Sequence, residues 1–531
     1  MVSRNKMLAV ALVILVLVAV PYTRNILKYQ IAVSVYPNVM SHSFARNDDN
    51  RTTARDAQDA LAIAKREGSK AKSVNAYWKV IERYPNEPAL YANMLRYASH
   101  WTLRSTRRPD EDEIRKGVPA WKPAPPSSEL DKIARAIEMG KKLEPDNAYF
   151  DLYEAILRFN QGRDPEGLAA IHRAAGKKEF EDHVFDELDA TIQNQRERTP
   201  KPLYSLNPIS RIAQACSVLL PHYMHFRSAA RVAGDYIEQD MRQGKRDEAL
   251  ATATDVINLG ILMREKSQTN IGVLVGIAIH NTAVLYAYKG LDGPEIDTEL
   301  TNVERLSKLQ ALIPNGFSSS QWKALHDSFA RSDEWRTRMR LFSRQDWDRT
   351  FRSAMLSAAL ISGGGLMLIF IILLGLIWGI SMVWLKKRGQ AGITGVEPSK
   401  LSVWLLAALS PAIVLMFISF MRMQLQFYPP TSGPDFPFGT AIILLTIFSP
   451  LGVIIVAAAR TRLAPEVGRF NTFLARLRTG SVYAMQALVV LYLLTMIADI
   501  PISIHSNRVA DTFFRTETQQ IWEYELPAKG K

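Results

Sequence analysis

The chain has 531 residues, a formal net charge of +13 and a single cysteine, Cys216. This length suits two or three folding units. One cysteine excludes an intramolecular disulfide and any CxxC motif for zinc, thiol exchange or haem attachment. Much of the basic excess lies beside apolar segments, where Lys and Arg set topology and contact lipid headgroups. We therefore expect membrane lipids, and no nucleic acid, among the partners.

The chain opens with a short membrane-directed segment. Arg4 and Lys6 precede an apolar run over residues 7–21, which is typical of a signal peptide or of an uncleaved anchor. The residues before Pro21 do not provide a clean pattern of small side chains at alternate positions, which cleavage requires. This favours an uncleaved anchor over residues 1–28.

Residues 50–350 show apolar positions at helical spacing and no convincing alternation, so we expect an all-α fold. An apolar stripe over residues 74–81 ends at Pro85, and a second one begins at Leu90. The same order of helix, proline turn and helix returns around Pro145. Repeated helix pairs are typical of a solenoid.

Two glycine turns carry a family resemblance. In residues 160–167 and 242–249, Gly162 and Gly244 are each followed five residues later by a small residue. These turns resemble the tetratricopeptide repeat: glycine permits a left-handed turn, and the small residue lets the next helix pack closely. The spacing departs from the family's period of about 34 residues, so the repeats are degenerate. The resemblance implies a helical solenoid over residues 29–335 that holds a peptide or another protein.

Several segments interrupt or blur this pattern. The proline-rich stretch 104–128 cannot continue a helix and is expected to be a surface excursion between helix pairs. A second proline-rich break over 199–208 is expected to divide the domain into two halves. Residues 271–288 are apolar enough for a membrane span, but Gly272 and Gly276 suit a buried solenoid helix better. Both interpretations stay open, and a span here would reverse the sidedness of every later segment.

A basic aromatic segment over residues 336–353 precedes the apolar last third. On a helix its aromatic residues could lie at headgroup depth while the arginines bind lipid phosphate. An ordinary solvated basic helix is the other interpretation. The lipid-headgroup candidates are Arg336, Arg338, Arg340 and Arg344.

Four long apolar segments come next. Each is long enough to cross the hydrocarbon core as a helix, which needs about 20 residues. They predict a transmembrane bundle over residues 354–505 and a C-terminal tail over 506–531. The segments cover residues 354–385, 402–420, 437–459 and 481–504.

The loops between these segments indicate orientation. Loops 386–401 and 460–480 are rich in Lys and Arg, which assigns them to the cytoplasm, whereas loop 421–436 contains only Arg422. With the anchor, five spans place the large domain outside the cytoplasm of a bacterial inner membrane. The arginines of 336–353 argue against this side, but short loops carry more weight.

Two features within the spans have functional interpretations. Gly375 and Gly379 form a GxxxG pattern, which lets helices approach closely, either within the bundle or against another subunit. Asp499 is an ionisable residue within a span, where charge is costly. A lone acid is a poor transport pathway, so we expect Asp499 to pair structurally.

Catalytic patterns are missing from the sequence. It contains no GxxxxGK[ST], HExxH, GxSxG or strand-associated GxGxxG motif. His222 and His225 could form a metal half-site, but satisfied interior histidines are the better interpretation. We therefore expect no enzyme, no metal and no cofactor.

The sequence favours a membrane-anchored scaffold or assembly protein that binds proteins through its solenoid, as a homo-oligomer or as a subunit of a larger complex. A transporter or transporter accessory subunit, active through the C-terminal helices, is the alternative. An enzyme with a dispersed site is the third possibility.

Overall fold

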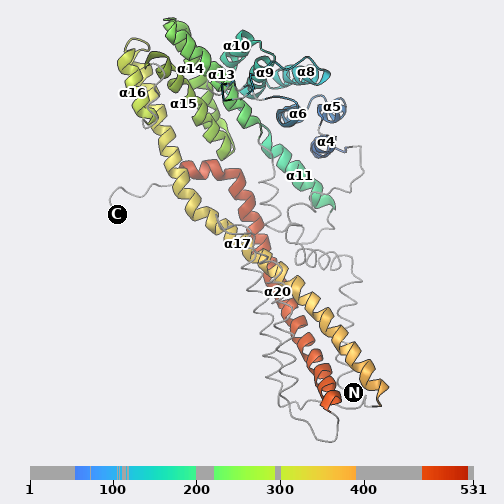
Figure 1. Ribbon diagram of the computed structural model, residues 1–531. Coiled ribbons are helices and arrows are strands. Elements are labelled where there is room, and N and C mark those ends of the chain that lie inside the picture. Colours follow the sequence, from blue (N-terminus) through green and yellow to red (C-terminus); the bar gives the residue numbers. More distant parts are fainter. Residues whose placement is uncertain are drawn as a thin grey trace, which may run out of the picture. The chain divides into compact units, whose positions relative to one another are not determined.

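The computed structural model describes residues 54–71, 73–104, 106, 108–109, 115–116, 119–198, 221–292, 301–389 and 469–523. These residues form helices and loops without a strand, apart from one parallel β-bridge between Asn147 and Glu179 (Figure 1). The predicted all-α class is confirmed for this part of the chain. The anchor 1–28 and the predicted spans 402–420 and 437–459 lie outside the described residues.

The chain divides into two compact units. Unit 1 contains Met1–Asn47, Thr199–Ala213 and Asp348–Asp511, and unit 2 contains Asp48–Arg198, Gln214–Trp347 and Thr512–Lys531. Two long helices, α17 (Ser319–Lys387) and α20 (Arg469–Glu523), each have residues in both units. The predicted segments 336–353 and 354–385 thus form parts of one helix, α17.

Unit 2 is built from successive helices that pack on a shared apolar core. Besides parts of α17 and α20 it contains α4 (Ala57–Ala71), α5 (Val74–Ile81), α6 (Pro88–Trp101), α8 (Ser128–Leu143), α9 (Ala148–Asn160), α10 (Asp164–Ala175), α11 (Val184–Arg198), α13 (His222–Arg242), α14 (Arg246–Lys266), α15 (Asn270–Asp292) and α16 (Asn302–Leu312).

Local sequence fixes where these helices begin. Ser127 caps α8 by accepting a hydrogen bond from the Leu130 amide, and the Asn147 side chain accepts one from the Tyr149 amide at the start of α9. Proline stands at the first position of α6, where its missing N–H costs nothing. The helix boundaries predicted around Pro85 and Pro145 agree with the structure.

The two glycine turns have the predicted geometry. Gly162 and Gly244 have φ angles of 72° and 77°, in the left-handed region that favours glycine. The next amides close each turn: Arg163 N donates to Arg158 O, and Lys245 N donates to Asp240 O, both at 2.9 Å. A Cβ atom added at Gly167 would lie 2.4 Å from the Phe159 ring, so the small residue is required for close packing.

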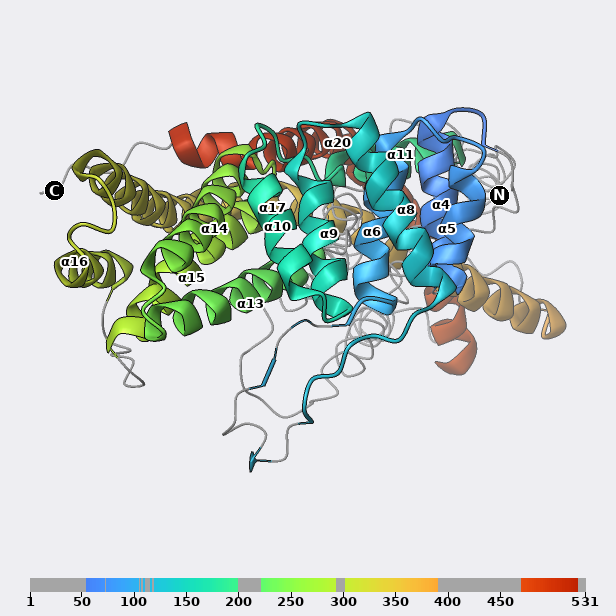
Figure 2. The ribbon, with the colours of Figure 1, turned by 90° about the horizontal axis from the view of Figure 1, so that it is seen from above.

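These turns join helices that also pack across pairs. Within each pair, α9 contacts α10 and α13 contacts α14; between pairs, α9 contacts α13 and α10 contacts α14 (Figure 2). Equivalent helices of the two pairs are therefore neighbours. His172 on α10 and Asp255 on α14 lie 2.9 Å apart and join the second helices of the two pairs.

The Gly244 turn allows a test of backbone strain alone, because an added Cβ there would meet nothing within 4 Å. We expect Gly244→Ala to lower the free energy of unfolding by about 1 to 2 kcal/mol, since alanine is strained in the left-handed region. Gly244→Asn should cost less, because asparagine tolerates this conformation. Urea unfolding of the purified protein measures both, and equal stability of all three forms would contradict the strain.

Helix α15 is the apolar segment for which two interpretations were open. Residues Asn270–Leu291 are long and apolar enough to span a membrane, yet 61% of the most apolar stretch is buried inside the protein. The helix packs against α13 and α14. At Gly260 on α14 and Gly276 on α15 the two backbones approach closely, since a Cβ at Gly260 would lie 2.7 Å from the Gly276 carbonyl oxygen. This packing favours the buried-helix interpretation.

Loops tie neighbouring helices together at one end of the stack. The Asn147 side chain accepts a hydrogen bond from the Glu181 amide and donates one to the Glu181 carbonyl. The Ala148 amide donates to the Glu179 carbonyl at 2.9 Å. The turn between α8 and α9 is thereby joined to the segment before α11.

The excursion before α8 is also tied down. The Asn160 side chain exchanges two hydrogen bonds with the backbone of Arg104, and Asp164 accepts from both Arg108 and Tyr236. Residues 119–127 have no regular secondary structure, as the proline-rich sequence predicted.

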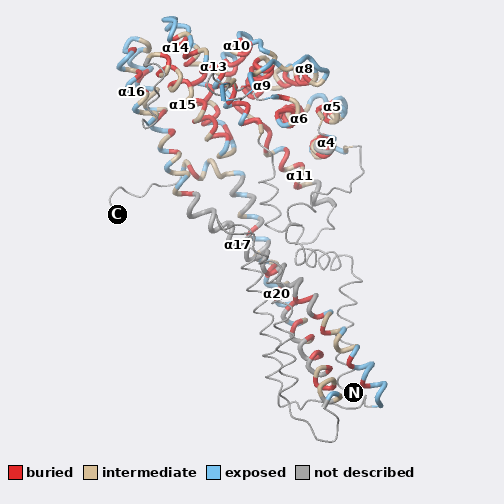
Figure 3. Tube along the Cα trace, in the orientation of Figure 1, coloured by how far each residue is buried: buried red, intermediate tan, exposed pale blue. Residues whose placement is uncertain are grey.

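In unit 1, buried apolar side chains on the described parts of α17 and α20 include Met367, Ile371, Leu374, Val482, Met485 and Leu488. The rings of Trp384 on α17 and Phe470 on α20 have centroids 6.2 Å apart. Other apolar side chains of these segments are exposed (Figure 3), among them Ile372, Leu376, Ile380, Val490, Leu494 and Ile497. Residues Leu488–Ser506 meet the length and composition required of a membrane span. By this criterion two described helices could cross a membrane.

Candidate functional site

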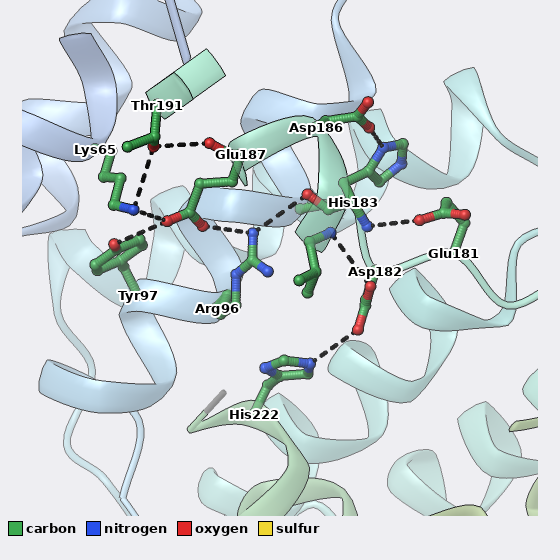
Figure 4. A network of polar contacts seen from close by, with 12 residues as sticks. Lys65, Arg96, Tyr97, Glu181, Asp182, His183, Asp186, Glu187, Thr191 and His222 are labelled. Atoms are coloured by element: carbon green, nitrogen blue, oxygen red, sulfur yellow. Dashed lines mark hydrogen bonds and ion pairs between the residues drawn. The ribbon is translucent and has the colours of Figure 1, made fainter. Parts of the chain in front are cut away.

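Charged side chains gather inside unit 2 where α11 meets α4, α6 and α13 (Figure 4). We call this set the Arg96 network. Its members are Lys65, Arg96, Tyr97, Glu144, Asp182, His183, Asp186, Glu187, His222 and Tyr223. Sequence analysis did not identify it as a site.

The centre of the network is an ion pair between Arg96 and Glu187. Arg96 Nη2 lies 2.8 Å from Glu187 Oε2, and each side chain is 1% exposed. Lys65 Nζ lies 2.6 Å from Glu187 Oε1, and its side chain is 21% exposed. Burial would raise the pKa of Glu187, but the positive charges of Lys65 and Arg96 outweigh it and lower that pKa. Glu187 is therefore held as a carboxylate in the interior.

The pairing of Arg96 is incomplete. Its Nε and Nη1 atoms are buried, and among the described residues they have no hydrogen-bond partner. The Nη2 atom also approaches the His183 carbonyl, at 3.5 Å. A buried guanidinium with unmet donors is costly, so removing its carboxylate partner should cost more than removing both charges.

His183 stands at the start of α11 in an unusual backbone conformation. Its φ angle of 56° lies in the left-handed region, which non-glycine residues rarely adopt. Its ring lies between two carboxylates, with Nδ1 2.6 Å from Asp186 and Nε2 3.1 Å from Glu144. Burial would lower the pKa of His183, but these hydrogen bonds and charges outweigh it and raise the pKa to about 10. The imidazole is thus charged at neutral pH.

His222 belongs to the same network but is neutral at neutral pH, whereas His183 is charged. Burial lowers its pKa to about 4, although Asp182 lies 3.3 Å from Nε2. Because a carboxylate can only accept, Nε2 carries the proton and donates it. The Tyr223 hydroxyl donates to the same carboxylate oxygen at 2.6 Å. His225 donates from Nε2 to the Ser99 carbonyl at 2.7 Å.

His222 and His225 are therefore interior residues that are each bonded through Nε2. Both Nδ1 atoms are buried without a hydrogen-bond partner among the described residues, so the expectation of satisfied histidines is met only in part. Their partners Asp182 and Ser99 are far away in sequence. Among the described residues, no group of three or more His, Cys, Asp or Glu side chains could hold a metal ion.

This geometry is suited to fixing helices in place. The Asp182 and His222 pair resembles the acid and base of a hydrolytic site, but both side chains are buried, at 6% and 0% exposure. A general base must reach a substrate proton, and a fully buried imidazole cannot do so without movement. The network joins α11 to α4 and α6 through the ion pairs of Glu187. The segment before α11 is joined to α13 through the hydrogen bonds that Asp182 accepts from His222 and Tyr223.

The charge on His183 predicts that the free energy of unfolding depends on pH. Its pKa is about 6.5 in the unfolded chain and about 10 when folded, so its contribution to stability is complete below pH 6.5 and is lost as the pH rises toward 10. Each unit of difference corresponds to about 1.4 kcal/mol. We expect the protein to lose stability between pH 6.5 and 10, and His183→Asn to remove most of that loss.

The difference between the two proteins is the quantity to measure, because lysines and tyrosines titrate in both. Asparagine suits the control since it tolerates a positive φ angle. Urea unfolding at several pH values gives the result. Parallel pH profiles for the two proteins would contradict a charged His183.

The lipid-headgroup candidates have protein partners where they are described. Arg336 Nη1 lies 3.4 Å from Asp333, and Arg338 Nη2 lies 2.6 Å from Glu334. Arg338 Nη1 also donates to the Trp522 carbonyl at 2.6 Å. Arg340 is exposed, and the side chain of Arg344 lies outside the described residues. Lipid binding by these arginines stays a prediction.

The candidates within the predicted spans do not share one site. A Cβ added at Gly375 would lie 3.8 Å from the Met485 sulfur, an ordinary contact, and one added at Gly379 would meet nothing within 4 Å. Among the described residues, no helix packs so closely against Gly375 or Gly379 that a larger side chain would be excluded. The Asp499 side chain is buried on α20. Its structural pairing stays a prediction.

Comparison with known proteins assigns no family or relative. No protein-family model matches the chain, and neither a curated protein nor a solved structure does so.

Proposed function

We propose that this protein is a membrane-anchored scaffold whose tetratricopeptide-like stack of helices binds another protein. The observation that carries the proposal is the arrangement of α9 and α10 beside α13 and α14, each pair joined by a left-handed glycine turn. Stacked pairs of this kind present extended surfaces that serve protein binding.

Attachment to a membrane is supported by unit 1. Its described helices expose large apolar side chains, with Leu376 at 57%, Ile380 at 67% and Ile497 at 63% exposure. Large apolar side chains exposed on long helices are typical of membrane contact. We infer a multi-pass protein of a bacterial inner membrane, with unit 2 on the extracytoplasmic side.

The Arg96 network supports the same function. A binding scaffold needs helices whose relative positions do not change when the partner leaves. Buried ion pairs fix such positions more specifically than apolar packing does in some proteins, at a cost in stability. The buried charges of unit 2 would then act indirectly, by fixing the helices that carry the binding surface.

The test uses the tagged full-length protein, purified in mild detergent from the membranes of its own cells. Ala169 on α10 and Ala251 on α14 are exposed on the second helices of the two pairs. We expect the wild type to retain a reproducible protein partner and the double variant Ala169→Arg and Ala251→Arg to lose it.

Ala120→Arg is the matched control, because Ala120 is equally exposed but lies in the loop before α8. This variant should retain the partner. Reproducible recovery of the wild-type protein alone would contradict the scaffold. Loss of the partner in the control as well as in the double variant would show that added charge, and not the α10 and α14 surface, controls binding.

A further inference from the structure

The end of α20 packs on unit 2 at a place that the sequence assigned to the C-terminal tail. We call residues 512–523 the C-terminal strap; they belong to unit 2. Ile521 is fully buried among the apolar side chains of α15 and α17. These side chains form what we call the Ile521 socket: Val273, Ile277, Trp335 and Phe342.

Polar contacts fix the direction of the strap. The Thr518 hydroxyl donates to the Gln268 carbonyl at 2.6 Å, and Arg338 donates to the Trp522 carbonyl at 2.6 Å. Arg515 forms an ion pair with Asp189 on α11. The strap therefore spans from α11 across the start of α15 to α17.

Aromatic and cationic contacts lie beside Ile521 and involve Trp335, Trp522 and Arg331. The rings of Trp335 and Trp522 have centroids 6.5 Å apart, and the Arg331 guanidinium lies 4.9 Å from the centre of the Trp522 ring. Cations over tryptophan faces are attracted by the ring. Successive apolar and aromatic residues of the strap make different contacts: Ile521 enters the socket, and Trp522 lies against Arg331.

The strap is held by few buried groups. Among its described side chains only Ile521 is buried, whereas the Arg515 and Asp189 side chains are 41% and 33% exposed. Exposed ion pairs contribute little to stability and are weakened by salt. Its covalent connection to the rest of α20 gives the strap a high effective concentration at the socket.

We propose that the Ile521 socket is a docking surface for an amphipathic helix, and that the strap is its resident and exchangeable occupant. Apolar anchors from one face of a helix in a groove are a general mode of recognition. Because α20 is one helix from Arg469 to Glu523 and includes the candidate span Leu488–Ser506, the strap continues that span, and its release uncovers the Ile521 socket on α15 and α17. This inference does not depend on the proposed scaffold function.

The first test adds a fluorescent peptide of residues 511–523 to the full-length protein in detergent. In the wild type the resident strap competes, so binding should be weak. In full-length Ile521→Glu the strap cannot bury its anchor, and we expect the peptide to bind at least tenfold more tightly. A peptide carrying the same substitution should bind neither protein.

Thr512→Glu is the matched control, because it adds the same charge at an exposed position of the strap. It should bind the peptide as weakly as the wild type. Equal peptide binding by wild type and Ile521→Glu would overturn the proposal, because the peptide would then bind elsewhere or not at all.

A crosslink provides a second measurement that does not rely on a destabilising variant. Thr518 and Gln268 are in contact, so cysteines at both positions, with Cys216→Ser, should form a disulfide under mild oxidation. We expect excess peptide added before oxidation to lower the yield severalfold. A high yield that the peptide does not change would show a permanently fixed strap and would overturn the proposal.

Discussion

Replacing Gly260 by alanine should lower the free energy of unfolding by about 3 kcal/mol, because the new methyl group meets backbone atoms that cannot turn away. The added Cβ would lie 2.5 Å from the His280 amide nitrogen and 2.7 Å from the Gly276 carbonyl oxygen. At Gly276 the contact is reciprocal, with an added Cβ 2.6 Å from the Arg264 amide nitrogen. Helices α14 and α15 would have to separate, which exposes apolar side chains around the contact.

Gly176→Ala is the matched control. Gly176 is the C-cap of α10 with a φ angle of −85°, and an added Cβ would meet its nearest neighbour at 3.6 Å. This substitution should be neutral or slightly stabilising, since alanine loses less entropy on folding than glycine. Urea unfolding of both variants, monitored by tryptophan fluorescence, gives the comparison. A Gly260→Ala variant as stable as the Gly176→Ala control would contradict the close approach of the α14 and α15 backbones at Gly260.

The second large effect concerns the Arg96 and Glu187 pair. We expect Glu187→Leu to cost about 3 to 5 kcal/mol, because it leaves the Arg96 guanidinium buried without its carboxylate. The double variant Arg96→Met and Glu187→Leu should recover most of that loss, since apolar side chains of similar volume need no pairing in the interior. A buried ion pair therefore predicts that the double variant has a higher free energy of unfolding than Glu187→Leu alone.

The exposed pair of Arg163 and Glu166 is the control. These side chains lie 2.6 Å apart but are 49% and 46% exposed. The equivalent substitutions Arg163→Met and Glu166→Leu should each change stability by less than about 1 kcal/mol and show little coupling. A thermodynamic cycle from urea unfolding measures the coupling in both pairs. Coupling as small at Arg96 and Glu187 as at the exposed pair would contradict a buried ionic link.

The parts of the fold that sequence predicted depend on local chemistry. Pro85 and Pro145 end helices wherever they occur, and the turns at Gly162 and Gly244 require a residue that accepts a positive φ angle. Such signals are contained in a few consecutive residues. For this reason the helix pairs could be derived without knowledge of tertiary contacts.

The Arg96 network could not be derived in the same way. Arg96 looks like one polar residue within an apolar helix, and its partner Glu187 lies much later in the chain. Only the fold brings them together. A partial signal existed in the density of acidic residues from Glu179 to Asp189. Of the acids on α11 in this range, only Glu187 is buried.

The C-terminal strap was missed for a different reason. Residues 506–531 resemble a polar tail because apolar residues are sparse there, and one buried isoleucine does not make a periodic pattern. Helix α15 shows the converse: its composition suits both lipid and a protein core. Packing against α13 and α14, which composition cannot reveal, separates the two environments.

The double hydrogen bond between Asn147 and the backbone of Glu181 bears on how the chain can vary in length. A residue inserted between α8 and α9 would move the Asn147 side-chain amide away from the Glu181 backbone. The segment that positions His183 would then lose this attachment. The turn at Gly244 has open space around it and no comparable tie among the described residues. Insertions, epitope tags and fused domains should thus be tolerated at the α13 to α14 junction and rejected at the α8 to α9 junction.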